Sequence, residues 1–281
     1  FGSSHFCSRS VMSAGRSRSR SARRESGKII DGFEAGIADG RLSWFCDPKG
    51  WSPREGQSEG KGGDWRLDGA GQLVISAPTK KDFWRKTYYA PVVCKDDGPC
   101  LFATIPAEET VMMETAFTLT PKRQFDQAGL CVRLDHEHWV KAGIEVVDGK
   151  PRLSCVFCNG YADWSTQPWP EPALRIKLHK IGSNIVVEAG PKGSSGNDGL
   201  TFIRIAHLSL AQGMSVDPLA DVKCDEGPAA PAGHVWMGVF ACCPEEQAGC
   251  TAVFHHLSIT KGTTLEHDAD VTHEDGTGAA K

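Results

Sequence analysis

Polar and aromatic side chains recur at every second position of one short segment, as Trp139, Lys141 and Glu145, with Gly143 between them. Alternate residues of a β-strand point to the same face, so we expect these side chains to share one face of a sheet. Lys141 and Glu145 can then bond to each other or to the hydroxyl groups of a ligand. A ligand-binding row competes with a cross-strand ion pair on a solvated face, which contributes at most about 1 kcal/mol. Catalysis by this row is a third, weaker interpretation.

The segment before this row has the same alternation. Residues 126–134 and 139–146 are expected to pair as a hairpin around residues 135–138, which places Gln127 and Arg133 on the face of Lys141 and Glu145. We therefore include Asp126 and Gln127 with Lys141 and Glu145 among the candidate ligand-binding residues.

A second candidate group is Asp82-Phe83-Trp84-Arg85. An aromatic ring beside a carboxylate and a guanidinium suits a sugar, because the apolar ring face stacks on the indole while charged groups bond to the hydroxyls. Trp84 fits equally well in the core, with Arg85 stacked on it or paired with Asp82. Phe83 and Trp84 point to opposite faces, so one of them must leave the core, and this favours a binding role for Asp82, Trp84 and Arg85.

Asp163-Trp164-Ser165 is predicted to lie in a loop between Gly160 and Pro168. Asp and Ser in such loops often cap turns. A position on the rim of a binding face would also let Trp164 close over a ligand, so Asp163 and Trp164 complete the candidate set.

Enzymatic motifs are weak. Retaining glycosidases need two carboxyl groups about 5 Å apart, and neither Glu-x-Asp-x-x-Glu nor Glu-x-Asp-x-Glu occurs. There is also no Gly-rich phosphate loop of the form Gly-x4-Gly-Lys-Ser/Thr. We assign no catalytic residue and lean against an enzyme. The alternative is a glycoside hydrolase that draws its carboxylate pair from Asp82, Asp126, Glu145 and Asp163.

The 11 cysteines do not form a recognisable metal or disulfide pattern. An odd count and irregular spacing in a chain of this size favour buried, reduced thiols in an intracellular protein. Cys155-x-x-Cys158 has no second pair, and the neighbours in Cys242-Cys243 and His255-His256 must face opposite ways on a strand. His136 and His138 fit an exposed turn better than a chelate. We predict no metal and no cofactor.

The elements that must position these residues are short strands. Period-two alternation and turn signals such as Asp148-Gly149 and Gly182-Ser183-Asn184 predict strands over residues 73–77, 112–119, 128–134, 140–146, 153–157, 174–178, 185–189, 202–208, 235–241 and 251–259. No long segment has a helical period. The pattern predicts an all-β fold, a sandwich of two antiparallel sheets over residues 28–261.

The two ends differ from this core. Residues 1–27 are rich in Ser and Arg and are expected to be a disordered basic tail or a transit-peptide remnant, and residues 262–281 a polar disordered tail. We expect a cytoplasmic location, with organelle import as the alternative. A net charge of -4 argues against nucleic acid, and no apolar stretch is long enough to span a membrane.

Several motifs together resemble a known family. They are Asp82-Phe83-Trp84-Arg85, Phe125-Asp126-Gln127-Ala128-Gly129-Leu130, the segment from Trp139 to Glu145, Asp163-Trp164-Ser165, and Gly238-Val239-Phe240 before Cys243-Pro244. In this order they resemble the concanavalin A-like family that includes the regulation-of-enolase protein. The resemblance implies a jelly-roll sandwich and a metabolic enzyme as partner, but no general activity. Residues 192–199 and 217–233 look like loop extensions relative to that family.

From these observations we predict a non-catalytic, lectin-like binding or regulatory module. Its concave face would bind a carbohydrate or a small polar metabolite.

Overall fold

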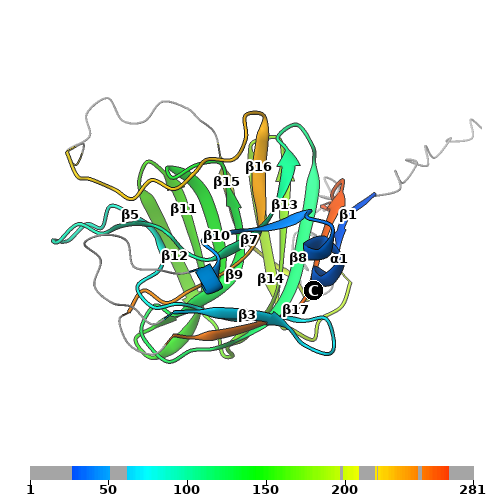
Figure 1. Cartoon of the computed structure of the whole chain (residues 1–281), viewed down its shortest axis with the longest axis horizontal. Helices are drawn as coiled ribbons and strands as arrows, with labels where there is room; N and C mark the ends of the chain where they lie inside the picture. Colours follow the sequence, from blue (N-terminus) through cyan, green and yellow to red (C-terminus); the bar gives the residue numbers. More distant parts are fainter. Residues whose placement is uncertain are drawn as a thin grey trace, which may run out of the picture.

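The alternating strands fold into two large antiparallel sheets in the computed structural model, which describes residues 27–50, 62–196, 199–208, 219, 221–245 and 249–265 (Figure 1). The predicted tails therefore lie almost wholly outside the described residues. Among the residues described, no helix is long and apolar enough to cross a membrane.

The first sheet has eight strands. In spatial order they are β15 (Thr201–His207), β14 (Asn184–Gly190), β13 (Ala173–Ile181), β8 (Val111–Thr120), β17 (Thr251–Lys261), β4 (Leu73–Ser76) and β3 (Asp64–Leu67), while β1 (Lys28–Asp31) pairs with β17. We call it the eight-stranded sheet.

The second sheet has seven strands. Their order is β12 (Ala162–Pro168), β11 (Lys150–Asn159), β10 (His138–Val147), β9 (Gln127–Arg133), β16 (His234–Cys242), β7 (Cys100–Pro106) and β2 (Leu42–Phe45). We call it the seven-stranded sheet. A separate two-stranded hairpin consists of β5 (Phe83–Arg85) and β6 (Cys94–Asp96), and the helical segments are α1 (Phe33–Ala38) and the 3-10 turn Pro48–Gly50.

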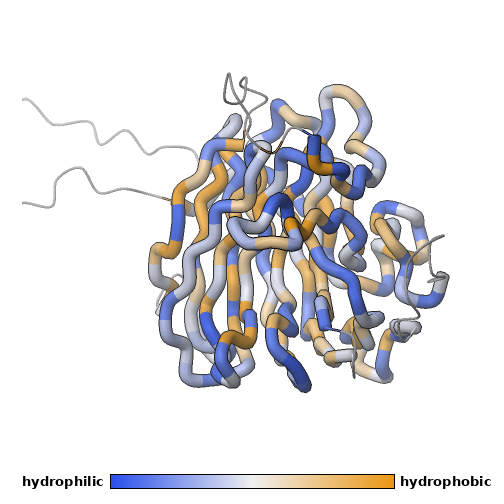
Figure 2. The backbone as a smooth tube through the Cα atoms, turned by 90° about the vertical axis from the view of Figure 1, so that its left-hand side faces the viewer, coloured by the Kyte–Doolittle hydropathy of each residue, from blue (hydrophilic) through white to orange (hydrophobic). Residues whose placement is uncertain are grey.

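The prediction of an all-β sandwich is confirmed. Each predicted strand is present, with ends shifted by a few residues at most. Alternation divides the side chains of each strand of the seven-stranded sheet between two faces. In Figure 2, hydrophobic (orange) and hydrophilic (blue) stretches follow one another along the chain. The inner face packs against the eight-stranded sheet in the main core, through residues such as Leu130, Val140 and Ile144.

The outer face of the seven-stranded sheet is also buried, which the sequence did not indicate. It carries a second apolar cluster consisting of Phe45, Phe83, Cys100, Phe102, Cys131, Trp139, Val156, Cys158, Phe240 and Cys242. Phe83 is the member that comes from the β5–β6 hairpin, and it is completely buried. The hairpin, the cyan segment that projects to the left in Figure 1, thus lies over the outer face. The predicted open binding face is therefore largely covered.

Candidate functional site

The predicted hairpin places the candidate residues of β9 and β10 on this outer face. Glu145 lies opposite Gln127 and Trp139 opposite Arg133 in the register of β9 with β10. These side chains and Lys141 are all buried. The prediction that they share a face is confirmed, while the expectation that the face is open to a ligand along its length is wrong.

Asp82 closes over this row. Its Oδ1 accepts hydrogen bonds from Lys141 Nζ at 2.9 Å and from Gln127 Nε2 at 3.1 Å. Lys141 Nζ also donates to the carbonyl of Phe83 at 2.6 Å. Burial by itself lowers the pKa of the Lys141 ammonium, but the nearby carboxylates of Asp82 and Glu145 outweigh burial and leave this pKa above its ordinary value. Lys141 is therefore a charged anchor for the hairpin, and its bonding capacity is largely used within the protein.

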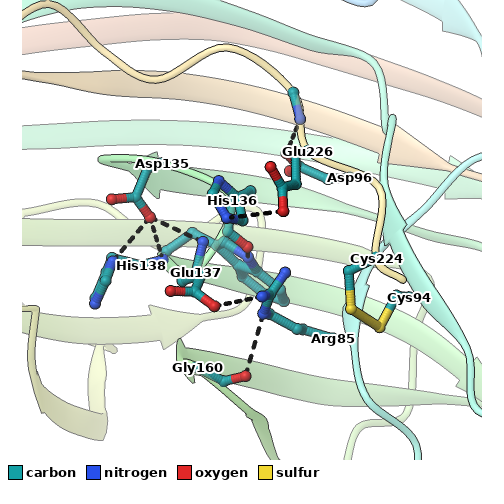
Figure 3. A network of polar contacts seen from close by, with 12 residues as sticks. Arg85, Cys94, Asp96, Asp135, His136, Glu137, His138, Gly160, Cys224 and Glu226 are labelled. Atoms are coloured by element: carbon teal, nitrogen blue, oxygen red, sulfur yellow. Dashed lines mark hydrogen bonds and ion pairs between the residues drawn. A yellow bond between two sulfur atoms is a disulfide. The ribbon is translucent and has the colours of Figure 1, made fainter. Parts of the chain in front are cut away.

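A second set of polar contacts involves both strands of the hairpin, Arg85 on β5 and Asp96 on β6. Arg85 bonds to the carboxylate of Glu137 and to the carbonyl of Gly160, as Figure 3 shows. Arg133 Nη2 pairs with Asp96 Oδ2 at 2.5 Å, and both side chains are almost completely buried. Because the Arg133–Asp96 pair is removed from water, it fixes the position of β6. The Arg85–Glu137 pair holds β5 more weakly, since the Glu137 side chain is 39% exposed. Arg85 thus lies in an anchoring contact.

Glu145 is buried on the same face, near the partly exposed Trp164. Its Oε2 accepts a hydrogen bond from Ser154 Oγ at 2.7 Å, and Ser154 Oγ accepts one from Trp164 Nε1 at 2.9 Å. Burial, opposed by Lys141 and by the bond from Ser154, raises the pKa of the Glu145 carboxyl to about 7. This carboxyl can therefore change between donor and acceptor near neutral pH.

These groups line a small hollow on the outer face. The hollow is lined by the side chains of Gln127, Lys141, Glu145, Ser154 and Phe240, and it has no room for a water molecule. Gly143 lines the hollow and lies opposite Gly129 in the register of β9 with β10, and a Cβ on Gly143 would lie 2.0 Å from the Ala128 carbonyl oxygen. Glycine is required there because the two backbones approach so closely.

Two tryptophans lie beside the hollow. Trp164 is 36% exposed, and its ring meets the ring of half-buried Trp84 edge-on, with centroids 6.0 Å apart. The Nε1 of Trp84 is buried and has no hydrogen-bond partner. We call Trp84, Glu145, Ser154 and Trp164, with the hollow between them, the rim site.

Asp126 and Asp163 do not line the hollow. Asp163 was expected in a loop but lies within β12, on the face opposite to Trp164, and pairs with Arg204 at 2.8 Å. Asp126 Oδ2 accepts the backbone N–H groups of Lys122 and Arg123, so it caps the turn before β9. Asp163 points away from Trp164 because successive side chains of a strand point to opposite faces. Asp126 is held by its bonds to the turn and so does not join the row of Lys141 and Glu145.

Most described cysteines agree with the prediction of buried thiols. All but Cys46 among the free ones are buried, and Cys155 and Cys158 face different cores, as do Cys242 and Cys243. The exception is a disulfide between Cys94 at the start of β6 and Cys224 (Figure 3). His136 approaches Glu226 while His138 bonds to Asp135, so the two histidines have different partners.

Ser154, Asp96 and Glu137 were missed as contributors. Ser154 lies opposite Gly143 in the register of β10 with β11. The Asp148-Gly149 turn signal between these strands could have revealed Ser154. Asp96 and Glu137 reach Arg133 and Arg85 across more than thirty residues of chain, and no local pattern indicates such contacts.

The comparisons with known proteins agree with this fold. Residues 61–262 match the family described as "Protein of unknown function (DUF1349)". "Regulation of enolase protein 1" of Saccharomyces cerevisiae is 30% identical over 197 residues, which covers 68% of this chain and 82% of that protein. "Uncharacterized protein AN7484" of Emericella nidulans is 28% identical over 203 residues, covering 69% of this chain and 89% of that protein.

Among solved structures, a functionally unknown protein from Saccharomyces cerevisiae superimposes with a TM-score of 0.59 at 23% identity, covering 80% of this chain and 98% of that one. The superposition supports the sandwich architecture. The family matched, the identity to the yeast protein and the shared fold confirm the resemblance noted in the sequence. The yeast regulation-of-enolase protein is a relative of this chain, and the chain belongs to the DUF1349 family.

Proposed function

We propose that this chain is a non-catalytic binding module that holds a carbohydrate or another small polar metabolite at the rim site, and that it regulates a metabolic enzyme. The ligand-binding part of this proposal rests on one observation. The partly exposed indole of Trp164 lies beside buried polar side chains. Trp164 offers a ring face for an apolar sugar face, while Glu145 and Ser154 lie next to its Nε1.

The unused donor of the rim site supports the same proposal. Buried polar groups without partners are uncommon, and they carry a free-energy cost that a ligand oxygen can relieve. Trp84 Nε1 is such a donor, and its ring is in contact with Trp164. The ligand would therefore need an acceptor close to its stacked face, as a hydroxyl-bearing ring provides.

Calorimetric titration of the purified chain, guided by a glycan array, tests this. Trp164→Ala should weaken binding about tenfold, which corresponds to about 1.4 kcal/mol. Phe202→Ala is the matched control, because Phe202 is also exposed but lies on β15 of the other sheet. No binding to any sugar, or equal binding by both variants, contradicts the proposal.

The regulatory part rests on the yeast relative, whose name refers to enolase. Enolase activity measured with and without a saturating amount of this chain tests it. A change in kcat or KM that depends on the chain is expected, and unchanged kinetics at saturating chain would contradict this part alone.

The glycoside hydrolase alternative has less support. It requires two carboxyl groups about 5–10 Å apart across a cleft. Asp82 is bound to Lys141 and Asp163 to Arg204, while the Asp126 carboxylate caps a turn. Glu145 remains without a second carboxylate from that set in the hollow.

A further inference from the structure

Three potential metal ligands meet at one end of the sandwich, where three strands begin or end. Asp126 directly precedes β9, Cys243 directly follows β16, and Cys250 directly precedes β17. One ligand atom from each lies within 4.8 Å of the other two, and all three residues are buried. The first two strands belong to the seven-stranded sheet and β17 to the eight-stranded sheet, so the cluster joins the two layers.

The Asp126 carboxylate has one oxygen in use and one without a partner. Oδ2 accepts the N–H groups of Lys122 at 2.6 Å and Arg123 at 2.9 Å. Oδ1 is buried and has no hydrogen-bond partner, and the whole residue is only 1% exposed. A buried carboxylate oxygen beside two sulfur atoms therefore remains to be satisfied, and a cation would satisfy it.

The separations suit a tetrahedral ion. Zn²⁺ binds thiolate sulfur at about 2.3 Å and carboxylate oxygen at about 2.0–2.2 Å, which places tetrahedral ligand atoms about 3.5–3.8 Å apart. The ligand atoms of this cluster lie within 4.8 Å of one another, so shifts of about 1 Å would bring them to those separations. The Cys250 N–H already donates to Cys243 Sγ at 2.7 Å, which holds the two cysteines together.

We propose that Asp126, Cys243 and Cys250 form a binding site for a divalent cation of the zinc type, with the fourth position taken by solvent. On binding, each thiol loses its proton to solvent and forms a sulfur–metal bond, while the carboxylate coordinates through Oδ1. The ion joins the ends of β9, β16 and β17 and so ties the two sheets together. The Cys243 carbonyl accepts the N–H of Lys81, so the ion also steadies the segment that leads to Asp82.

Cobalt titration of the chelator-treated full chain under reducing conditions tests the proposal. We expect one equivalent of Co²⁺ with a thiolate-to-metal charge-transfer band, displaced by one equivalent of Zn²⁺. Cys243→Ser and Cys250→Ser should abolish this band. Asp126→Asn should weaken binding at least tenfold, while its amide oxygen can still cap the turn. Cys155→Ala is the matched control, because Cys155 is a buried thiol outside the cluster, and it should leave the titration unchanged.

Measurements on the wild-type chain keep the test independent of how well the variants fold. Zn²⁺ should raise the unfolding temperature of the wild type. It should also slow the alkylation of Cys243 and Cys250, mapped by mass spectrometry, but not that of Cys155. No binding by the folded wild type, a disulfide between Cys243 and Cys250 under these conditions, or a band that survives in Cys250→Ser would overturn the proposal.

Discussion

Replacing Lys141 with Met should destabilise the protein by about 3–5 kcal/mol, the typical cost of removing one partner from a buried ion pair. Lys141 Nζ and Asp82 Oδ1 lie 2.9 Å apart, and their side chains are 2% and 12% exposed. Methionine retains most of the apolar stem and removes the charge and the donors. Asp82 would keep its bond from Gln127, but the carbonyl of Phe83 would lose the donor it now has in Lys141.

The loss should depend on pH. Burial already raises the pKa of the Asp82 carboxyl above 3.8, and Lys141 opposes this shift. Without Lys141 the pKa of Asp82 rises further, so the folded state binds the proton more tightly than the unfolded state does. The destabilisation by Lys141→Met is therefore greatest at neutral pH, and it shrinks as the pH falls toward 3.8 and Asp82 becomes protonated.

Urea unfolding followed by tryptophan fluorescence at several pH values measures both effects. Lys28→Met is the control, because Lys28 forms an ion pair with Asp31 in which both side chains are more than 60% exposed, and it should cost less than about 1 kcal/mol. In a double-mutant cycle, Asp82→Asn combined with Lys141→Met should cost much less than the sum of the single changes. A cost for Lys141→Met no larger than that of Lys28→Met, or additive costs in the cycle, would refute this account of the anchor.

Three further predictions concern the same face. The free energy of unfolding should fall as the pH rises from 4.5 to about 7, because Glu145 holds its proton to a higher pH in the folded state than in the unfolded state. Urea titrations across that range measure this component, which amounts to at most about 3 kcal/mol. Glu145→Gln should remove it. Gly143→Ala should lower the free energy of unfolding by about 1–3 kcal/mol or more, because the new Cβ would clash with the Ala128 carbonyl. Gly69→Ala, which has open space around it, should leave the thermal unfolding nearly unchanged. Phe83→Ala should lower the free energy of unfolding by about 3–5 kcal/mol and speed proteolysis of the β5–β6 hairpin. Tyr88→Ala, at a residue that is 98% exposed, should change neither the stability nor the proteolysis. Equal proteolysis of the two variants would argue against Phe83 as the anchor of the hairpin.

The strands could be predicted because their signal is local. In β10, Val140, Ala142 and Ile144 alternate with Trp139, Lys141 and Gly143, and this determines which side chains share a face before any partner is known. The turn Asp148-Gly149 likewise predicts that β10 and β11 are neighbours. The strands that were missed are short, such as β2 and β6, or lack clear alternation, as does β7 with its Cys100–Pro106 sequence.

The state of the outer face could not be read in the same way. A row of Trp, Lys and Glu has the same pattern whether it is exposed to water, bound to a ligand or covered by another part of the chain. The difference depends on Asp82, which lies 59 positions before Lys141, and on Asp96, which lies 37 positions before Arg133. Contacts of this range follow from how the whole chain closes, and no spacing within a strand encodes them.

The sequence by itself determined the all-β architecture, the β9–β10 hairpin and the shared face of Gln127, Arg133, Lys141 and Glu145, since these depend on alternation between neighbouring residues. Only the tertiary structure decided that the β5–β6 hairpin covers this face and that Asp82 neutralises Lys141. It also decided that Trp164 stays partly exposed beside Glu145 and Ser154, and that Asp126 meets Cys243 and Cys250. The physical reason is that burial and charge pairing are set by the groups that face a side chain across space, and those groups come from distant parts of the chain.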